Sequence, residues 1–155
     1  MKLHLYQDYN FFATLNIYNI MAQFTRKRKG SKNSIVIFML TMLNTIKMYH
    51  WQTFSYPQHK ATDDLFTTLQ DLVDKFIEVL LGKTNSRFTL PKTFTLHISN
   101  FSNVKKLSQM ITNYKEYLIN IDKHLPKGMT NTDLLNIRDE MISELNKFLY
   151  LLSLK

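Results

Sequence analysis

Apolar side chains recur at helical spacing in four stretches of the chain, and this pattern predicts four helices. The clearest stripe is formed by Leu65, Phe66, Leu69, Leu72, Val73, Phe76 and Leu80. The helices are expected over residues 34–53 and 58–81, from residue 101 or 102 to residue 124, and from residue 130 or 132 to the end. The first of them is apolar on more than one side, which indicates that it contacts several neighbours.

Turn and capping residues mark the expected ends of these helices. Ser34 is the candidate N-cap of the first helix, and Thr130 or Thr132 is the candidate N-cap of the fourth. Pro57 separates the first two helices, and Gly82 is the expected C-terminal signal of the second.

The lengths of the connections predict how the helices are joined. Short connections between the first and second helices and between the third and fourth are typical of antiparallel hairpins. The second helix would be about 36 Å long at ~1.5 Å per residue, and about seventeen extended residues at ~3.3 Å each can return along it. The predicted fold is therefore all-α, a ferritin-like four-helix bundle with one long crossover. A simple up-and-down bundle with a loose loop is the alternative.

The size and composition suit a single helical domain. A chain of 155 residues builds one core, and three Gly and three Pro disfavour a turn-rich all-β fold. The absence of Cys excludes disulfides, thiol catalysis and zinc fingers. It is consistent with an intracellular location, cytoplasmic or nuclear, or with a virion. No apolar run reaches the ~18–20 residues of a membrane span, so we expect no membrane association.

Residues 1–33 differ from the bundle at 34–155 and are predicted to form a poorly ordered extension. Residues 1–20 are aromatic and Asn-rich without a clear period, and Met21 is an alternative start. A basic arm without an apolar face follows, and its candidate nucleic-acid-binding residues are Arg26, Lys27, Arg28, Lys29 and Lys32. A phosphate-binding arm, a nuclear-import signal and a solvated linker are the alternatives for this segment.

The net charge of +8 and the pI near 9.6 favour an anionic partner. Non-specific DNA is the partner that a basic arm suits, through phosphate contacts and the release of counterions. An AT-rich coding sequence is the other explanation, because all but four of the twenty basic residues are Lys.

Two histidines flank the predicted joint between the first two helices, in the stretch MYHWQTFSYPQHKATDDL. His50 lies at the end of the first helix and His59 at the start of the second. At about 100° per residue, one sector of the second helix, away from the apolar stripe, contains His59, Asp63, Asp74 and Glu78. Imidazoles and carboxylates bind divalent metals, whereas a solvated polar face is the simpler explanation of carboxylates on a helix.

The composition of the helices excludes a ferritin-type di-iron centre inside the bundle. A ferritin-type di-iron centre needs Glu and Glu-x-x-His ligands that point inward from the four helices. The first predicted helix has no carboxylate, and no Glu-x-x-His occurs in the chain. A metal bound by the second helix would therefore lie outside its own bundle, with further ligands from a neighbouring subunit.

These spacings resemble the ferroxidase signature of the Dps-type mini-ferritins, ferritin-like proteins that protect DNA during starvation. The signature has a His-Trp pair, here His50-Trp51, and a second His, here His59. Its carboxylates follow at the spacings of Asp63, Asp74 and Glu78. In detail the chain is similar to a poorly characterised ferritin-like family of large DNA viruses and protists. The interval between the two histidines is shorter than in the mini-ferritins, so the distance between the imidazoles is a question for the structure.

The resemblance implies Fe(II) oxidation by peroxide or oxygen between two-fold-related subunits of a homo-oligomer, with ferric mineral held in a hollow shell. It assigns His50 and His59 to one chain and Asp74 and Glu78 to its partner, with Asp63 assisting a second iron. Trp51 would lie near the site, and no catalytic residue is implied beyond the ligands.

The implied metal is iron, with zinc as a competitor. The alternative is a non-enzymatic bundle, a structural, virion or nucleic-acid-associated protein with a vestigial site that binds no metal.

Overall fold

The computed structural model describes residues 32–98, 100–101 and 103–154, and within these ranges it is all-α. The four α-helices are α2 (Lys32–Gln52), α3 (Tyr56–Thr84), α4 (Val104–Ile119) and α5 (Thr132–Ser153). A short 3-10 helix, η1 (Ile121–His124), follows α4, and no described residue lies in a strand. The prediction of an all-α bundle is therefore confirmed. The predicted N-terminal extension lies outside the described residues, apart from Lys32 and Asn33, which begin α2.

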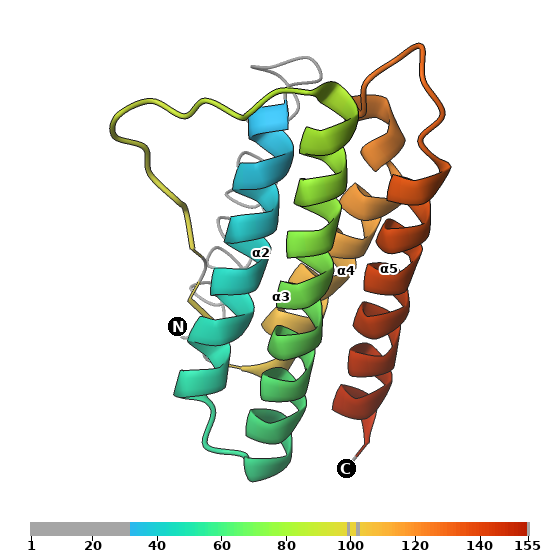
Figure 1. Cartoon of the computed structure of the whole chain (residues 1–155). Coiled ribbons are helices and arrows are strands. Elements are labelled where there is room, and N and C mark those ends of the chain that lie inside the picture. The colour runs from blue at the N-terminus through green and yellow to red at the C-terminus, as the bar shows by residue number, and fades with distance from the viewer. Residues whose placement is uncertain (1–31, 99, 102, 155) are drawn as a thin grey trace, which may run out of the picture.

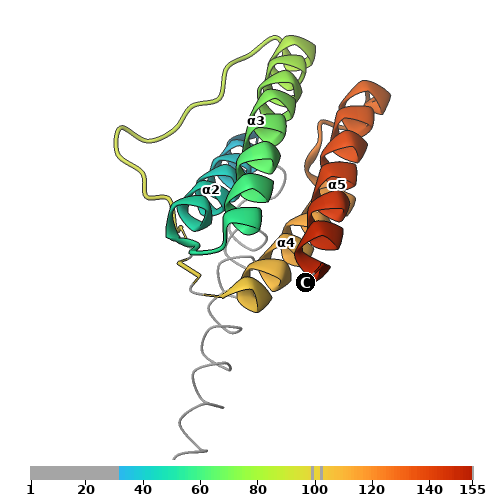
Figure 2. The same ribbon diagram turned by 90° about the horizontal axis from the view of Figure 1, so that it is seen from below.

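The helices form two antiparallel hairpins joined by one long connection (Figure 1). α3 packs against both α2 and α5, and α4 packs against α5. The connection at 85–103 leaves one end of α3, passes along the outside of α2 and reaches the other end of the bundle, where α4 begins. α3 and α4 therefore run in the same direction, and they lie diagonally opposite each other in the view along the bundle (Figure 2).

Buried apolar side chains from all four helices form one core. On the side where α2 meets α4, the ring of Phe38 stacks on Tyr117, with ring centroids 3.6 Å apart. Phe38 also meets the ring of Tyr114 edge-on at 5.7 Å. Burial raises the pKa of both tyrosine hydroxyls far above the ordinary value, so both remain protonated. This aromatic cluster joins the first hairpin to the second.

α2 is covered on almost its whole surface, as its broad apolar sector predicted. Trp51 is the one exposed residue of this helix, and the others are buried or half-buried. Near its first turn the side chain of Asn33 bonds to the backbone of Thr89 in the connection, donating to the carbonyl at 2.5 Å and accepting from the N–H at 3.3 Å. The connection is thereby held against the start of α2.

The predictions for the ends of α2 and α3 were wrong. α2 begins at Lys32, so Ser34 is a buried residue inside the helix and not its N-cap. α3 continues past Gly82 to Thr84, and its C-cap is Asn85, which adopts the left-handed conformation with φ 41°. Asn tolerates this conformation at the end of a helix almost as Gly does, and here its N–H donates to the Gly82 carbonyl at 3.2 Å.

The third predicted helix is divided in two, and the fourth has a different N-cap. α4 ends at Ile119 with Asn120 as its C-cap, and η1 follows. From α5, Arg138 Nη1 donates to the carbonyls of Leu118 and Ile119, both at 3.3 Å, and so binds free acceptors at the end of α4. The N-cap position of α5 is held by Asn131 and not by either predicted threonine.

Among the described helices, none combines the length and the apolar character that crossing a membrane requires.

Candidate metal site at the joint of α2 and α3

The two imidazoles at the joint between α2 and α3 lie in contact. His50 is on the last turn of α2 and His59 on the first turn of α3, with the three residues 53–55 between the helices. Their rings stack with centroids 3.9 Å apart and an angle of 24° between the planes. The short interval between them therefore brings the two rings together, which answers the question that the sequence left open.

Each histidine is held by the backbone of the other. His50 Nδ1 donates to the His59 carbonyl at 3.0 Å, and His59 Nδ1 donates to the His50 carbonyl at 3.0 Å. A carbonyl oxygen only accepts, so both Nδ1 atoms carry the proton, and in the neutral rings both Nε2 atoms keep a free lone pair. A histidine that binds a metal through Nε2 commonly has its other nitrogen fixed in this way.

Hydrogen bonds of polar side chains next to the imidazoles connect the end of α2 to the start of α3. Thr62 is fully buried, and its hydroxyl donates to the Gln58 carbonyl at 2.7 Å and lies 3.5 Å from His50 Nδ1. The Gln58 side-chain oxygen accepts from the hydroxyls of Tyr49 at 2.6 Å and Thr53 at 3.1 Å. His50 is only 7% exposed, so its ring is positioned by packing and hydrogen bonds together.

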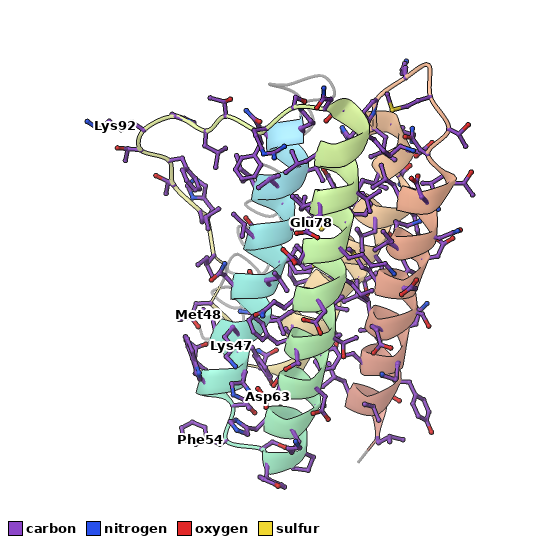
Figure 3. The ribbon with its side chains drawn as sticks, in the orientation of Figure 1. Lys47, Met48, Phe54, Asp63, Glu78 and Lys92 are labelled. Carbon is purple, nitrogen blue, oxygen red and sulfur yellow. The ribbon has the colours of Figure 1, made fainter. Side chains whose placement is uncertain are left out.

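Asp63 is the carboxylate of the same chain that reaches this pair. Its Oδ1 lies 3.7 Å from His50 Nε2 and 3.3 Å from Lys47 Nζ. The hydrogen bond from Lys47 lowers the pKa of Asp63, and the nearby charges of Lys47, His50 and Lys60 act in the same direction. Figure 3 shows Lys47 on α2 and Asp63 on the neighbouring part of α3.

Lys47, which the sequence did not single out, contacts several of the residues around the histidine pair. Its ammonium lies 4.7 Å from the centre of the Phe66 ring and 5.9 Å from that of Trp51, besides its contact with Asp63. Its position one turn before His50 could have indicated that it shares a face of α2 with the histidine. The ammonium competes with any metal for the oxygen of Asp63.

Asp74 and Glu78 lie far from the histidines of their own chain. Both are exposed on α3, and at ~1.5 Å per residue Asp74 is about 22 Å from His59 along the helix. Figure 3 shows Glu78 higher on α3 than Asp63. Within one chain, the described residues contain no group of three or more His, Cys, Asp or Glu side chains that could hold a metal ion.

Asp74 lines an open groove of about 560 Å³ between α2 and α3. The walls are mainly apolar and include Leu40 and Leu43 of α2, Ile77 of α3 and Phe88 of the connection. Asp71 and Asp74 bring carboxylates to it. The groove thus combines an apolar surface with acidic side chains on the outer side of the first hairpin.

The remaining predicted residues lie at the edge of the site or outside it. Trp51 is 67% exposed beside the joint. Lys32 is part of α2, and its ammonium contacts the hydroxyls of Thr84 and Ser86. The other four predicted nucleic-acid-binding residues, Arg26, Lys27, Arg28 and Lys29, lie outside the described residues.

A family model matches residues 50–152, which span both histidines, the three carboxylates and α3 to α5. It describes a family of unknown function, DUF5856. The chain belongs to this family.

One relative of this DUF5856 member is the uncharacterised 14.6 kDa protein of the mobD–ri intergenic region of Enterobacteria phage T4. The two are 37% identical over 70 residues, which make up 43% of this chain and 55% of the phage protein. The match therefore spans about half of the phage protein's length. No solved structure matches the chain.

Proposed function

We propose that this DUF5856 member is a mini-ferritin-like homo-oligomer that binds Fe(II) and oxidises it at a site between two subunits. The observation that carries the proposal is the pair His50 and His59, whose Nδ1 atoms are both held by carbonyls, which leaves Nε2 of each ring as the nitrogen that can bind a metal. Two hairpins joined by a connection along the bundle are also the arrangement of ferritin-like proteins.

A two-fold dimer through the first hairpin would complete the ligand set. If two α3 helices cross in antiparallel fashion near Thr68, midway between His59 and Glu78, each histidine pair comes opposite the other chain's acidic residues. The apolar groove that holds Asp74 lies on this outer side and offers the surface such a dimer would bury. The dimer thus explains why ligand types about 22 Å apart in one chain lie on the same side of α3.

In this proposal iron is the substrate, and the chain supplies the positions where it binds. The imidazoles of His50 and His59 and the partner's carboxylates suit Fe(II), with zinc as a competitor. Each hydrogen peroxide takes one electron from each of two Fe(II) ions and two protons, its O–O bond breaks, and both oxygens leave as water. The hydrolysis of the two Fe(III) ions to ferric oxide then releases protons to the solvent. Asp63 assists the second iron once its contact with Lys47 opens.

The alternative is a non-enzymatic bundle with a vestigial site, acting as a structural, virion or nucleic-acid-associated protein. The ammonium of Lys47, 3.3 Å from Asp63, favours it because a cation of the protein already neutralises this carboxylate. The phage-encoded relative is consistent with a viral origin under either proposal. In both, the basic arm at 26–32 binds DNA non-specifically through phosphate contacts.

Iron uptake separates the two proposals. With Fe(II) and peroxide, the wild-type protein is expected to develop ferric absorbance, and the double variant His59→Ala/Glu78→Ala is expected to lose it. The matched control is His97→Ala/Glu140→Ala, which removes the same two residue types from positions outside the site and should behave as wild type.

Native mass spectrometry with metal analysis supplies a second readout. The proposal expects dimers or larger assemblies that retain iron, and fewer bound metal ions in the double variant. A metal-free monomer would remove both the intersubunit site and the shell, and would leave the non-enzymatic alternative.

A further inference from the structure

The charged residues of the folded part are unevenly distributed between two regions. No Asp or Glu occurs from residue 79 to residue 115, a range that contains the whole connection and most of α4. α3 carries five carboxylates and α5 carries four. An AT-rich coding sequence explains a high number of lysines, but it does not explain why carboxylates are confined to particular helices.

The cations of the two regions also differ in their partners. Every cation of α3 and α5 has a carboxylate within 4 Å, in the pairs Lys60–Asp64, Lys75–Glu140, Lys83–Asp133, Arg138–Asp139 and Lys147–Glu144. By contrast, in the carboxylate-free range from residue 79 to residue 115, the side-chain charges of four exposed residues have no ion-pair or hydrogen-bond partner among the described residues. These four residues, which we call the crossover cations, are Arg87, Lys92, Lys105 and Lys106.

The crossover cations extend along the molecule and do not surround a pocket. Arg87 lies near the start of the connection and Lys105 in the first turn of α4, just after its end. The connection runs the length of α2 (Figure 1). That length is about 31 Å for 21 residues at ~1.5 Å each. Lys92 points away from the bundle at the tip of the connection (Figure 3). None of the four lines the groove at Asp74 or a second hollow of about 500 Å³ between the joint of α2 and α3 and the start of α4.

This distribution fits an extended polyanion better than a small phosphorylated molecule. We infer that the connection and the first turn of α4 form a second DNA-binding surface, in which the crossover cations contact the phosphates of duplex DNA. Their extent is close to one turn of B-form DNA, about 34 Å. The duplex presents one negative charge per ~1.7 Å of its axis, so widely spaced cations each find a phosphate.

The backbone of the connection supports an aqueous anionic partner. Residues 87–98 make no backbone–backbone hydrogen bond with any described residue. Thr89 donates its N–H to Asn33, and Pro91 has no N–H, but the other N–H groups of this segment can donate to phosphate oxygens or water, whereas in the apolar part of a membrane they would be left without partners. The N-terminus of α4, where Lys105 and Lys106 lie, adds the positive end of a helix dipole.

This surface is distinct from the basic arm and does not depend on the metal site. The arm joins the bundle at Lys32, close to the place where Asn33 holds Thr89 of the connection. Arm and connection can therefore contact one duplex together. The inference extends the DNA association proposed above, and it can fail while iron uptake and the arm's contribution both stand.

Two charge-matched variants of the full chain test the inference. Arg87→Gln/Lys92→Gln/Lys105→Gln removes three crossover cations, and Lys60→Gln/Lys75→Gln/Lys147→Gln removes three paired cations from α3 and α5. Both lower the net charge by three, and circular dichroism confirms that each is folded. Binding to a fluorescent duplex is measured by anisotropy between low and moderate salt.

The crossover variant is expected to bind more weakly, with the slope of log K against log salt reduced by about 0.9 for each phosphate that the protein no longer neutralises. The paired-cation variant should keep the wild-type slope. Equal weakening in both variants would mean that only net charge matters, and an unchanged crossover variant would mean that the arm alone binds; either result overturns the inference.

A third variant and a second probe separate the remaining outcomes. Arg26→Gln/Arg28→Gln/Lys29→Gln should reduce the slope further when it is combined with the crossover variant. Phosphatidylserine vesicles test a membrane partner. If the crossover substitutions abolish binding to vesicles and leave binding to duplex DNA unchanged, the surface serves a membrane and the inference is wrong.

Discussion

α3 and α5 differ from the connection and α4 in how their charges are used. On α3 and α5 each cation faces a carboxylate, whereas the crossover cations face solvent without a partner. Exposed ion pairs contribute little to stability, so neither set of charges explains how the bundle is held together. The buried apolar side chains hold the bundle together. The exposed charges are therefore available for binding a partner.

The largest expected effect on stability comes from removing the aromatic contact between the two hairpins. Phe38 is 1% exposed and stacks on Tyr117, so Phe38→Ala should lower the free energy of unfolding by about 3–5 kcal/mol. Chemical denaturation with urea measures the loss. Phe38→Leu keeps most of the volume and should cost much less. A loss below about 1 kcal/mol in the alanine variant would mean that the aromatic contact contributes little to joining the hairpins.

A substitution of Lys47 tests whether its ion pair with Asp63 weakens metal binding near the histidines. Lys47→Met removes the ammonium 3.3 Å from Asp63 and should increase the affinity for Zn²⁺ about tenfold, or about 1.4 kcal/mol. Isothermal titration calorimetry measures the Zn²⁺ affinity of both proteins. Lys60→Met is the matched control, because Lys60 pairs with Asp64 instead. Equal affinities in wild type and Lys47→Met would show that Lys47 does not compete with the metal.

A smaller, pH-dependent effect on stability is expected from His124, which lies between α4 and α5. Burial lowers the pKa of His124 below its usual 6.5, and its ring stacks on Tyr117 with centroids 5.4 Å apart. The unfolded chain then binds the proton more readily, so stability falls as the pH drops below about 6.5, until the pH reaches the pKa of the folded state.

His124→Phe keeps the stacked ring and should flatten the stability profile in that range, measured by urea denaturation at several pH values. His97→Gln, in the exposed connection, should leave the profile as it is. Because the pKa of Asp63 is lowered from its ordinary 3.8, Asp63 changes the stability only below about that pH. The contributions of His124 and Asp63 to the free energy of unfolding therefore fall in separate pH ranges. A His124→Phe profile identical to the wild type would contradict the assignment.

The smallest effect is expected for a pair on α3 and α5. Lys75 and Glu140 lie 3.8 Å apart, and both side chains are more than half exposed. A double-mutant cycle of Lys75→Gln and Glu140→Gln should give a coupling energy below about 0.5 kcal/mol. A coupling above about 1 kcal/mol would mean that the ion pairs on this side stabilise the bundle and are not merely neutralised charge.

Much of the fold was predictable because helical periodicity is a local property. The apolar stripe at Leu65 to Leu80 placed α3, and the broad apolar sector of α2 indicated that several neighbours cover it. Helix ends were less predictable. At Asn85 a residue other than the predicted Gly82 adopts the left-handed conformation, because the cap depends on where the last carbonyls are satisfied.

For the candidate site, the sequence by itself determined which residues share a face: a regular helix fixes the angles between His59, Asp63, Asp74 and Glu78. It also determined where carboxylates are absent. Only the tertiary structure decided the stacking of His50 on His59, their exchange of hydrogen bonds and the contact of Lys47 with Asp63. These contacts depend on how the three-residue turn sets one helix against the other, and no periodicity along the chain encodes that geometry.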